Sequence, residues 1–227
     1  MIDSLLAILA PHSCCGCGYH GSLLCDNCKY DIISEPLDCC IACLKPTVRD
    51  NLCSACRTKQ PFAAAWLVGV RRGALKTLLD RYKFSSARRA GYEAADLLDA
   101  RLPVLLDSMV IVPVPTSPLH RRVRGFDHTA MIAKRLAKLR GLRYAQALAR
   151  DNADTQHFLG RAERLAAASK GLRLAGSVPE NVLLLDDIYT TGATLHASAQ
   201  LLRDNGAKTV SVAVIARQVL DEDADLW

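Results

Sequence analysis

The sequence predicts an α/β fold with a doubly wound, mainly parallel sheet, preceded by a small cysteine-rich module. Three observations support this prediction. Unbroken apolar runs of strand length alternate with amphipathic helical patterns after Pro61. All 10 cysteines lie in the first quarter of the 227 residues. The excess of basic residues falls on the cysteine-free part, so we expect one domain at residues 1–60 and a second at 61–227.

Composition restricts the class of protein. Half of the residues are apolar and 29 Lys+Arg stand against 23 Asp+Glu, which excludes a compositionally disordered chain and a disulfide miniprotein. Residues 1–60 hold 5 basic and 6 acidic residues, net −1, which leaves 24 and 17, net +7, for the rest. The apolar run before Pro11 follows Asp3 and no basic residue, so Met1 to Ala10 is expected to be a short packing helix. A cytoplasmic protein without membrane insertion is expected.

The first elements of the larger domain follow from their apolar patterns. Residues 65–70 (AWLVGV) are a continuous apolar run and predict a strand. Residues 73–84 have a basic amphipathic pattern and predict a helix, and residues 91–102 predict a second one. Residues 109–114 (MVIVPV) again form an apolar run of strand length. Strands of this kind are typical of parallel sheets that are covered on both faces.

The alternation continues after a Pro-rich basic loop. We expect a helix over residues 127–139 and a strand near 144–148. Residues 150–171 are polar and show no buried pattern. The remaining expected elements are a strand at 181–186 (NVLLLD), a helix at 194–205 and a strand at 209–215 (TVSVAVI).

Eight of the cysteines form four C-x2-C pairs. The pairs are Cys14 with Cys17, Cys25 with Cys28, Cys40 with Cys43, and Cys53 with Cys56. Two thiolates on one tight turn can bind a tetrahedral ion, and a second pair completes four sulfurs around Zn²⁺. We expect two structural zinc sites, paired sequentially because this needs the shorter loop closure, although the spacing also permits interleaved pairs. Cys15 and Cys39 are left as packed or free thiols, although the sequence also permits them to replace their neighbours Cys14 and Cys40 as ligands.

Residues 182–194 (VLLLDDIYTTGAT) carry the chemistry of the larger domain. The apolar strand ends in Asp186 and Asp187, and a turn at Thr190, Thr191 and Gly192 leads through Ala193 and Thr194 into a helix. Backbone N–H groups and the dipole at a helix N-terminus bind a phosphate monoester, and threonine hydroxyls add donors. Adjacent carboxylates at the carboxyl end of a strand suit vicinal hydroxyls or hydrated Mg²⁺. The pattern is neither a Walker A loop nor a G-x-G-x-x-G fingerprint.

This motif resembles the phosphoribosyl pyrophosphate (PRPP) signature of type I phosphoribosyltransferases. Further segments, together with the cysteine pairs, resemble the ComF (competence protein F, also called GntX-like) family over nearly the whole chain. These segments are VPVP at 112–115, RRVRGF at 121–126, and Gln156 with RAER at 161–164. The resemblance implies a phosphoribosyltransferase-like domain behind a double zinc ribbon.

The resemblance also assigns roles to residues. Asp186 and Asp187 would bind the ribose 2′ and 3′ hydroxyls, and Thr190, Thr191, Gly192, Ala193 and Thr194 the 5′-phosphate. The stretch from Pro113 to Arg124 would be the pyrophosphate loop. Three arginines there carry enough positive charge for a diphosphate, namely Arg121, Arg122 and Arg124. The same charges also suit a solvated basic loop or a nucleic-acid contact. Residues 156–164 resemble the flap that closes over PRPP.

The chain departs from the family pattern at three places. Asp127-His128 stands where the family usually has Asn-Gln after Arg-Gly-Phe. Gly160 replaces a serine before the RAER run, and an asparagine downstream is replaced within residues 166–168. These changes affect the polar contacts expected of the loop and the flap, whereas the phosphate loop is intact.

Two classes of function follow. In the first, the chain binds PRPP with Mg²⁺ and transfers the phosphoribosyl group to an acceptor, as a pentosyl glycosyltransferase linked to competence and to the handling of internalised DNA. Purine-salvage relatives carry an acid where Thr190 stands, so the resemblance implies that the chain is unsuited to that chemistry, and it leaves the acceptor unknown. In the second, the fold serves as a non-catalytic factor in DNA uptake that binds single-stranded DNA or other competence proteins. Basic residues are concentrated at 71–89 and 120–150, although few aromatic residues stand between them.

Overall fold

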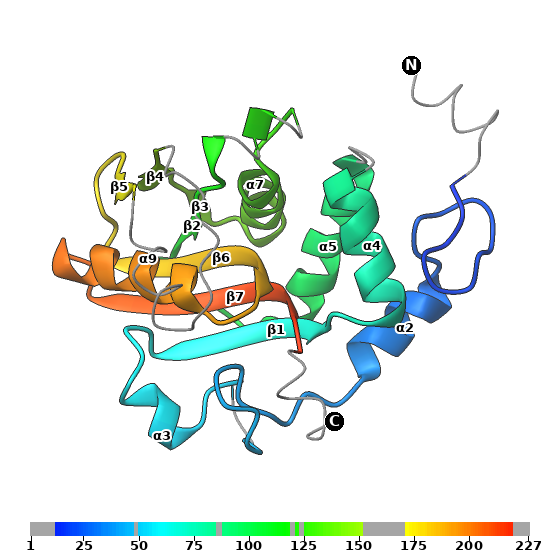
Figure 1. Ribbon diagram of the computed structural model, residues 1–227, viewed down its shortest axis with the longest axis horizontal. Helices are drawn as coiled ribbons and strands as arrows, with labels where there is room; N and C mark the ends of the chain where they lie inside the picture. Colours follow the sequence, from blue (N-terminus) through cyan, green and yellow to red (C-terminus); the bar gives the residue numbers. More distant parts are fainter. Residues whose placement is uncertain are drawn as a thin grey trace.

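A five-stranded parallel sheet forms the centre of the protein (Figure 1). The structure is a computed structural model that describes residues 12–47, 50–84, 88–118, 121–122, 125–151 and 171–219. Its strand order is β1-β7-β6-β2-β3, and all four neighbouring pairs are parallel. The strands are β1 (Ala64–Val70), β2 (Val110–Pro113), β3 (Arg143–Tyr144), β6 (Asn181–Tyr189) and β7 (Thr209–Arg217). The predicted fold class is confirmed.

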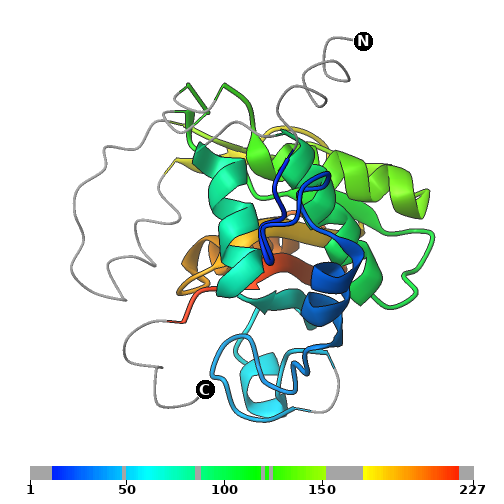
Figure 2. The same ribbon diagram turned by 90° about the vertical axis from the view of Figure 1, so that its right-hand side faces the viewer.

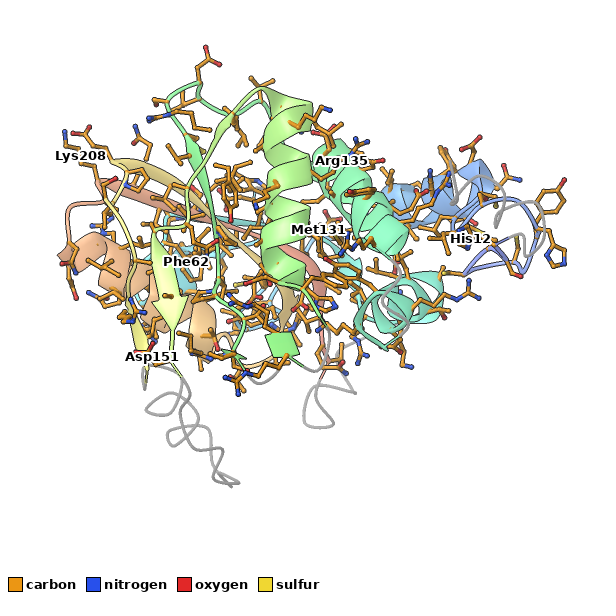
Figure 3. All side chains as sticks on the ribbon, turned by 90° about the horizontal axis from the view of Figure 1, so that it is seen from above. His12, Phe62, Met131, Arg135, Asp151 and Lys208 are labelled. Carbon is orange, nitrogen blue, oxygen red and sulfur yellow. The ribbon has the colours of Figure 1, made fainter. Side chains whose placement is uncertain are left out.

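Helices cover both faces of the sheet. The helices α4 (Gly73–Phe84), α5 (Arg88–Arg101) and α7 (His128–Arg140) pack on one face, where β6 contributes Leu183 and Leu185. Figure 3 shows α7 lying across this face with Arg135 directed toward α5, where it pairs with Asp96 at 3.0 Å. The helix α9 (Ala193–Asp204) packs on the opposite face with Leu184 of β6. Alternate residues of each buried strand therefore enter two separate apolar cores.

The border between β2 and β6 is the topological switch point of the sheet. From β2 the chain crosses through α7 to β3, whereas from β6 it crosses through α9 to β7 on the other side. The register between β2 and β6 ends at Pro113 and Leu185, and β6 continues beside β7 as far as Tyr189. In open α/β sheets the crevice at the carboxyl ends of such strands is where ligands bind.

Two short strands form a small antiparallel sheet beside the main one. The strand β4 (Leu148–Arg150) pairs with β5 (Leu172–Leu174). The single strand predicted over 144–148 is wrong, because the chain leaves the main sheet after Tyr144 and enters the second sheet at Leu148. The strand β5 was not predicted, since three residues carry too little periodicity to be recognised.

The two cysteine segments lie on opposite faces of the edge strand β1 (Figure 2). The first contributes Leu23 and Leu24 to the core beneath α4 and α5, and it includes α2 (Asp26–Ser34). The second contributes Ile41 and Leu52 to the core of the other face, and it includes α3 (Ser54–Arg57). The division at residue 60 stays a prediction, and both segments share cores with the sheet.

Some expectations concern residues outside the described ranges. The helix expected from Met1 to Ala10 and the flap at residues 156–164 are among them. Within the described ranges, every helix is too short or too polar to cross a membrane.

Candidate functional site

The two adjacent acids lie inside β6, not at its end. The strand runs on to Tyr189, so the boundary predicted at Asp186 is wrong by three residues. Successive side chains of a strand point to opposite faces. Asp187 accordingly meets α4 on one face, whereas Asp186 lies under the influence of Arg150 in β4. Both acids follow directly after Leu185, where β2 leaves the sheet.

Lys83 is a site residue that the sequence did not indicate. Its Nζ lies 2.7 Å from Oδ2 of Asp187, and both side chains are only 14% exposed. Lys83 stands in the last turn of α4, far from the motif along the chain. The basic pattern of this helix was the signal available, but it gave no information on which acid the lysine would reach.

Asp186 has the more perturbed ionisation. Burial, followed by the negative charge of Asp187, raises the pKa of Asp186 to about 8. A hydrogen bond from the N–H of Asp187 to Oδ1 of Asp186, at 2.9 Å, acts in the opposite direction, as do the charges of Lys83 and Arg150. Asp186 is therefore largely protonated at neutral pH and can donate as well as accept a hydrogen bond.

The expected phosphate loop connects β6 to α9. Gly192 is the N-cap of α9 in the left-handed conformation (φ 75°), and no side chain caps the helix there. The N–H of Ala193 donates to Oγ1 of Thr191 at 3.4 Å, and Thr190 is exposed. The first turn of this 12-residue helix has N–H groups without partners inside the helix and the positive end of the helix dipole, which is the arrangement that binds phosphate.

The side chain of Tyr189 packs against this loop at Gly192. A Cβ on Gly192 would lie 2.3 Å from the hydroxyl of Tyr189, so only glycine allows the approach. Tyr189 is 4% exposed, and the guanidinium of Arg217 lies 5.4 Å from its ring centroid. The N–H of Gln218 also donates to the carbonyl of Tyr189 at 2.8 Å. The loop is therefore packed against an aromatic ring that its own contacts hold in place.

The basic loop follows β2, the neighbour of β6. Arg121 and Arg122 are exposed, and Arg124 lies outside the described residues. Because β2 and β6 are parallel and adjacent, the loops that follow them leave the same edge of the sheet. The expected pyrophosphate loop and the phosphate loop thus flank the switch point.

The departures at Asp127 and His128 have structural roles. Asp127 is the N-cap of α7, and its Oδ1 accepts from the N–H of Ala130 at 3.0 Å and from the hydroxyl of Thr116 at 3.2 Å. His128 is fully buried, with Nε2 3.1 Å from the carbonyl of Tyr82. The hydroxyl of Tyr82 donates to the carbonyl of His128 at 2.6 Å. This reciprocal pair fastens the end of α4, and hence Lys83, to the start of α7.

Eight of the cysteines form two groups of four, in the sequential arrangement that the shorter loop closure predicts. The groups are Cys14, Cys17, Cys25 and Cys28, and Cys40, Cys43, Cys53 and Cys56. The sulfurs of each group lie within 4.8 Å of one another. The S···S distances of three hydrogen-bonded thiol pairs, Cys14–Cys25, Cys17–Cys25 and Cys43–Cys53, are 3.6 to 3.8 Å. Tetrahedral zinc with Zn–S bonds of about 2.3 Å places its sulfurs about 3.8 Å apart. Both groups are thus compatible with structural zinc.

In each group, hydrogen bonds lower the pKa of one thiol, Cys14 in the first and Cys53 in the second. Burial raises the pKa of Cys14, but N–H groups that include those of Cys25 and Gly16 outweigh this and lower it to about 6. The N–H of Cys56 lowers the pKa of Cys53 to about 7. Metal ligation requires thiolates, so these hydrogen bonds favour binding. Cys15 and Cys39 lie outside both groups, and burial raises the pKa of each.

Comparison with known proteins supports the family. The model of the phosphoribosyl transferase domain family matches residues 148–225. Competence protein ComFC of Streptococcus pneumoniae R6 is 30% identical over 145 residues, which cover 63% of this chain and 64%, just under two thirds, of ComFC. DNA utilization protein YhgH of Escherichia coli O6:H1 is 33% identical over 196 residues, which cover 78% of this chain and 83% of YhgH. YhgH of Salmonella typhimurium is 32% identical and covers 82% of this chain and 86% of that protein.

The fold and the site therefore define a domain of the phosphoribosyltransferase type. The chain belongs to the family of the ComFC and YhgH proteins, as the resemblance predicted.

Proposed function

We propose that the chain binds PRPP together with Mg²⁺ at the border of β2 and β6. The observation that carries the proposal is the coincidence of three features at the topological switch point: the acid pair, the uncapped N-terminus of α9 and the loop with Arg121 and Arg122. Each feature matches one part of PRPP, namely the ribose diol, the 5′-phosphate and the diphosphate.

Each group has a defined task in this proposal. Asp186 and Asp187 hydrogen-bond the ribose hydroxyls, and the negative charge of Asp187 stabilises the positive ribose of an oxocarbenium-like transition state. The N–H groups of α9 and the hydroxyls of Thr190, Thr191 and Thr194 hold the 5′-phosphate. Arg121, Arg122 and Arg124 neutralise the diphosphate as it leaves C1′. The metal ion, when bound, adds positive charge on that leaving group.

The proposed biological setting is the handling of internalised DNA in competence. The names of ComFC and YhgH support it, as does the concentration of basic residues in the larger domain. The cysteine groups are proposed to hold two structural zinc ions. Transfer of the phosphoribosyl group to an acceptor is the first form of the proposal.

A second form is a non-catalytic PRPP-dependent factor that binds DNA or another protein. The exposed Thr190 favours it, because purine-salvage relatives carry an acid at the corresponding position. The exposed arginines of the larger domain, which include Arg88 and Arg89 at the start of α5 and Arg121 and Arg122 after β2, also suit a nucleic-acid backbone.

Calorimetry with PRPP and Mg²⁺ tests the proposal. The wild type is expected to show saturable heat, and the Asp186→Asn/Asp187→Asn variant to lose at least about tenfold in affinity. Asp204→Asn, at the exposed far end of α9, is the matched control and should bind like the wild type. An absence of heat with the wild type would refute PRPP binding. Binding without pyrophosphate release, in the presence of nucleobases or single-stranded DNA, would favour the non-catalytic form.

A further inference from the structure

A lysine from outside the motif contacts the acid pair. The ion pair between Lys83 and Asp187 is short, at 2.7 Å, and is largely shielded from water, since each side chain is 14% exposed. A pair in this position is screened less than one on the surface. The helix α4 thus brings a positive charge to the carboxylate that is expected to meet the ribose.

The position of Lys83 is fixed by its neighbours. Tyr82 is fully buried, exchanges two hydrogen bonds with His128 and packs so closely on Gly91 that a Cβ there would lie 2.6 Å from its ring. The end of α4 is therefore held by both α5 and α7. The backbone from which the Lys83 side chain extends toward Asp187 is therefore fixed in place.

The acid pair carries no excess of negative charge over the cations beside it. Asp187 is paired with Lys83, and Asp186, on the other face of β6, interacts with the positive charge of Arg150. Because Asp186 is largely protonated at neutral pH, a single carboxylate faces two cations, and the acid pair has no excess of negative charge. A free divalent cation is bound by carboxylates in excess of nearby positive charge, whereas a sugar diol needs only hydrogen-bond partners.

We propose that Lys83 is a specificity-determining residue that makes the acid pair select a sugar diol over a free divalent cation. The acid pair then holds the hydroxyls of a bound ligand, and a free cation does not compete for it. The identity of that ligand rests on the proposed function, whereas the exclusion of a free cation does not.

Titration of the zinc-loaded full chain with Mn²⁺, followed by the electron paramagnetic resonance of the free ion, tests this proposal. Lys83→Met removes the positive charge and should bind Mn²⁺ at least about tenfold more tightly than the wild type. Lys83→Arg keeps the charge and should behave like the wild type. Lys76→Met is the matched control, because Lys76 pairs with Asp80 at 3.0 Å on the same helix and is 55% exposed.

The outcomes separate the possible roles of Lys83. If Lys83→Met melts at a lower temperature but binds Mn²⁺ no better than the wild type, Lys83 only ties α4 to β6 and the proposal fails. It fails equally if Lys76→Met gains the same affinity. The calorimetry with PRPP is independent: a wild type that does not bind PRPP, combined with tighter Mn²⁺ binding by Lys83→Met, would refute the proposed function and support the role of Lys83.

Discussion

Replacing Gly192 by alanine should disturb the phosphate loop more than its small size suggests. Two costs add at this position. An L-residue in the left-handed conformation costs about 1 kcal/mol, and Gly192 has φ 75°. The new Cβ would also lie 2.3 Å from the hydroxyl and 2.4 Å from Cζ of Tyr189, whose ring is buried against Arg217. Forcing such a ring aside costs about 1–3 kcal/mol, so the total is about 2–4 kcal/mol.

Gly141 offers a matched control. It is the C-cap of α7 with φ 65°, and a Cβ there meets nothing within 4 Å. Gly141→Ala should therefore lower the free energy of unfolding only by the cost of the left-handed backbone, about 1 kcal/mol. Because the change in the unfolded chain is the same for both variants, the difference between them isolates the clash with Tyr189.

Urea unfolding followed by circular dichroism measures both costs, and calorimetry with PRPP reports on the loop. Gly192→Ala should unfold more easily than Gly141→Ala and should bind PRPP more weakly. If the two variants lose the same free energy of unfolding, Tyr189 yields without cost and the argument for a rigid support is wrong.

Three further changes test other parts of the structure. Cys40→Ser should lower the zinc content from about two ions to about one per chain, and Cys39→Ser should leave it unchanged, as metal analysis by mass spectrometry would show; equal zinc content in the two variants would contradict the grouping of sulfurs. Since burial raises the pKa of Asp186 to about 8, the folded chain keeps a proton that the unfolded chain loses above about pH 4. The wild type should thus lose at least about 1.4 kcal/mol of stability relative to Asp186→Asn between about pH 5 and about pH 9, and a constant difference in urea unfolding would rule out the raised pKa. Tyr82→Phe removes the buried bond to a backbone carbonyl and should cost about 1–2 kcal/mol, whereas Tyr92→Phe, at a ring that is 45% exposed, should cost little in the same assay.

The elements of the main sheet could be predicted because their signals are local. The helix α4 begins and ends at the predicted residues 73 and 84, and the runs NVLLLD and TVSVAVI are the starts of β6 and β7. The strand predicted over 144–148 was wrong because two sheets share that stretch, and a change of sheet leaves no periodic signal. The sequence does not reveal the end of β6, because the apolar run stops at the acid pair, whereas pairing with β7 extends the strand through Asp187 and Ile188 to Tyr189.

The candidate site also contains residues that the sequence reveals and residues that it does not. The residues from Asp186 to Thr194 are contiguous, so a motif could reveal them. Lys83 and Arg150 reach the acids only through tertiary packing, which no spacing along the chain encodes. The opposite orientation of the two acids follows from strand alternation, but only once the strand is known to continue beyond Asp186.

The position of β1 has a consequence for the synthesis of the chain. Its partner in the sheet is β7, the last strand in the described sequence, so β1 leaves the ribosome well before the strand it pairs with. Meanwhile both of its faces are apolar and open to aggregation. The cysteine segments are made before β1 and pack on those two faces. If the zinc-bound segments protect β1 from aggregation, zinc supplied during refolding should raise the yield of soluble protein more than zinc added afterwards. Equal yields would show that β1 does not need this protection.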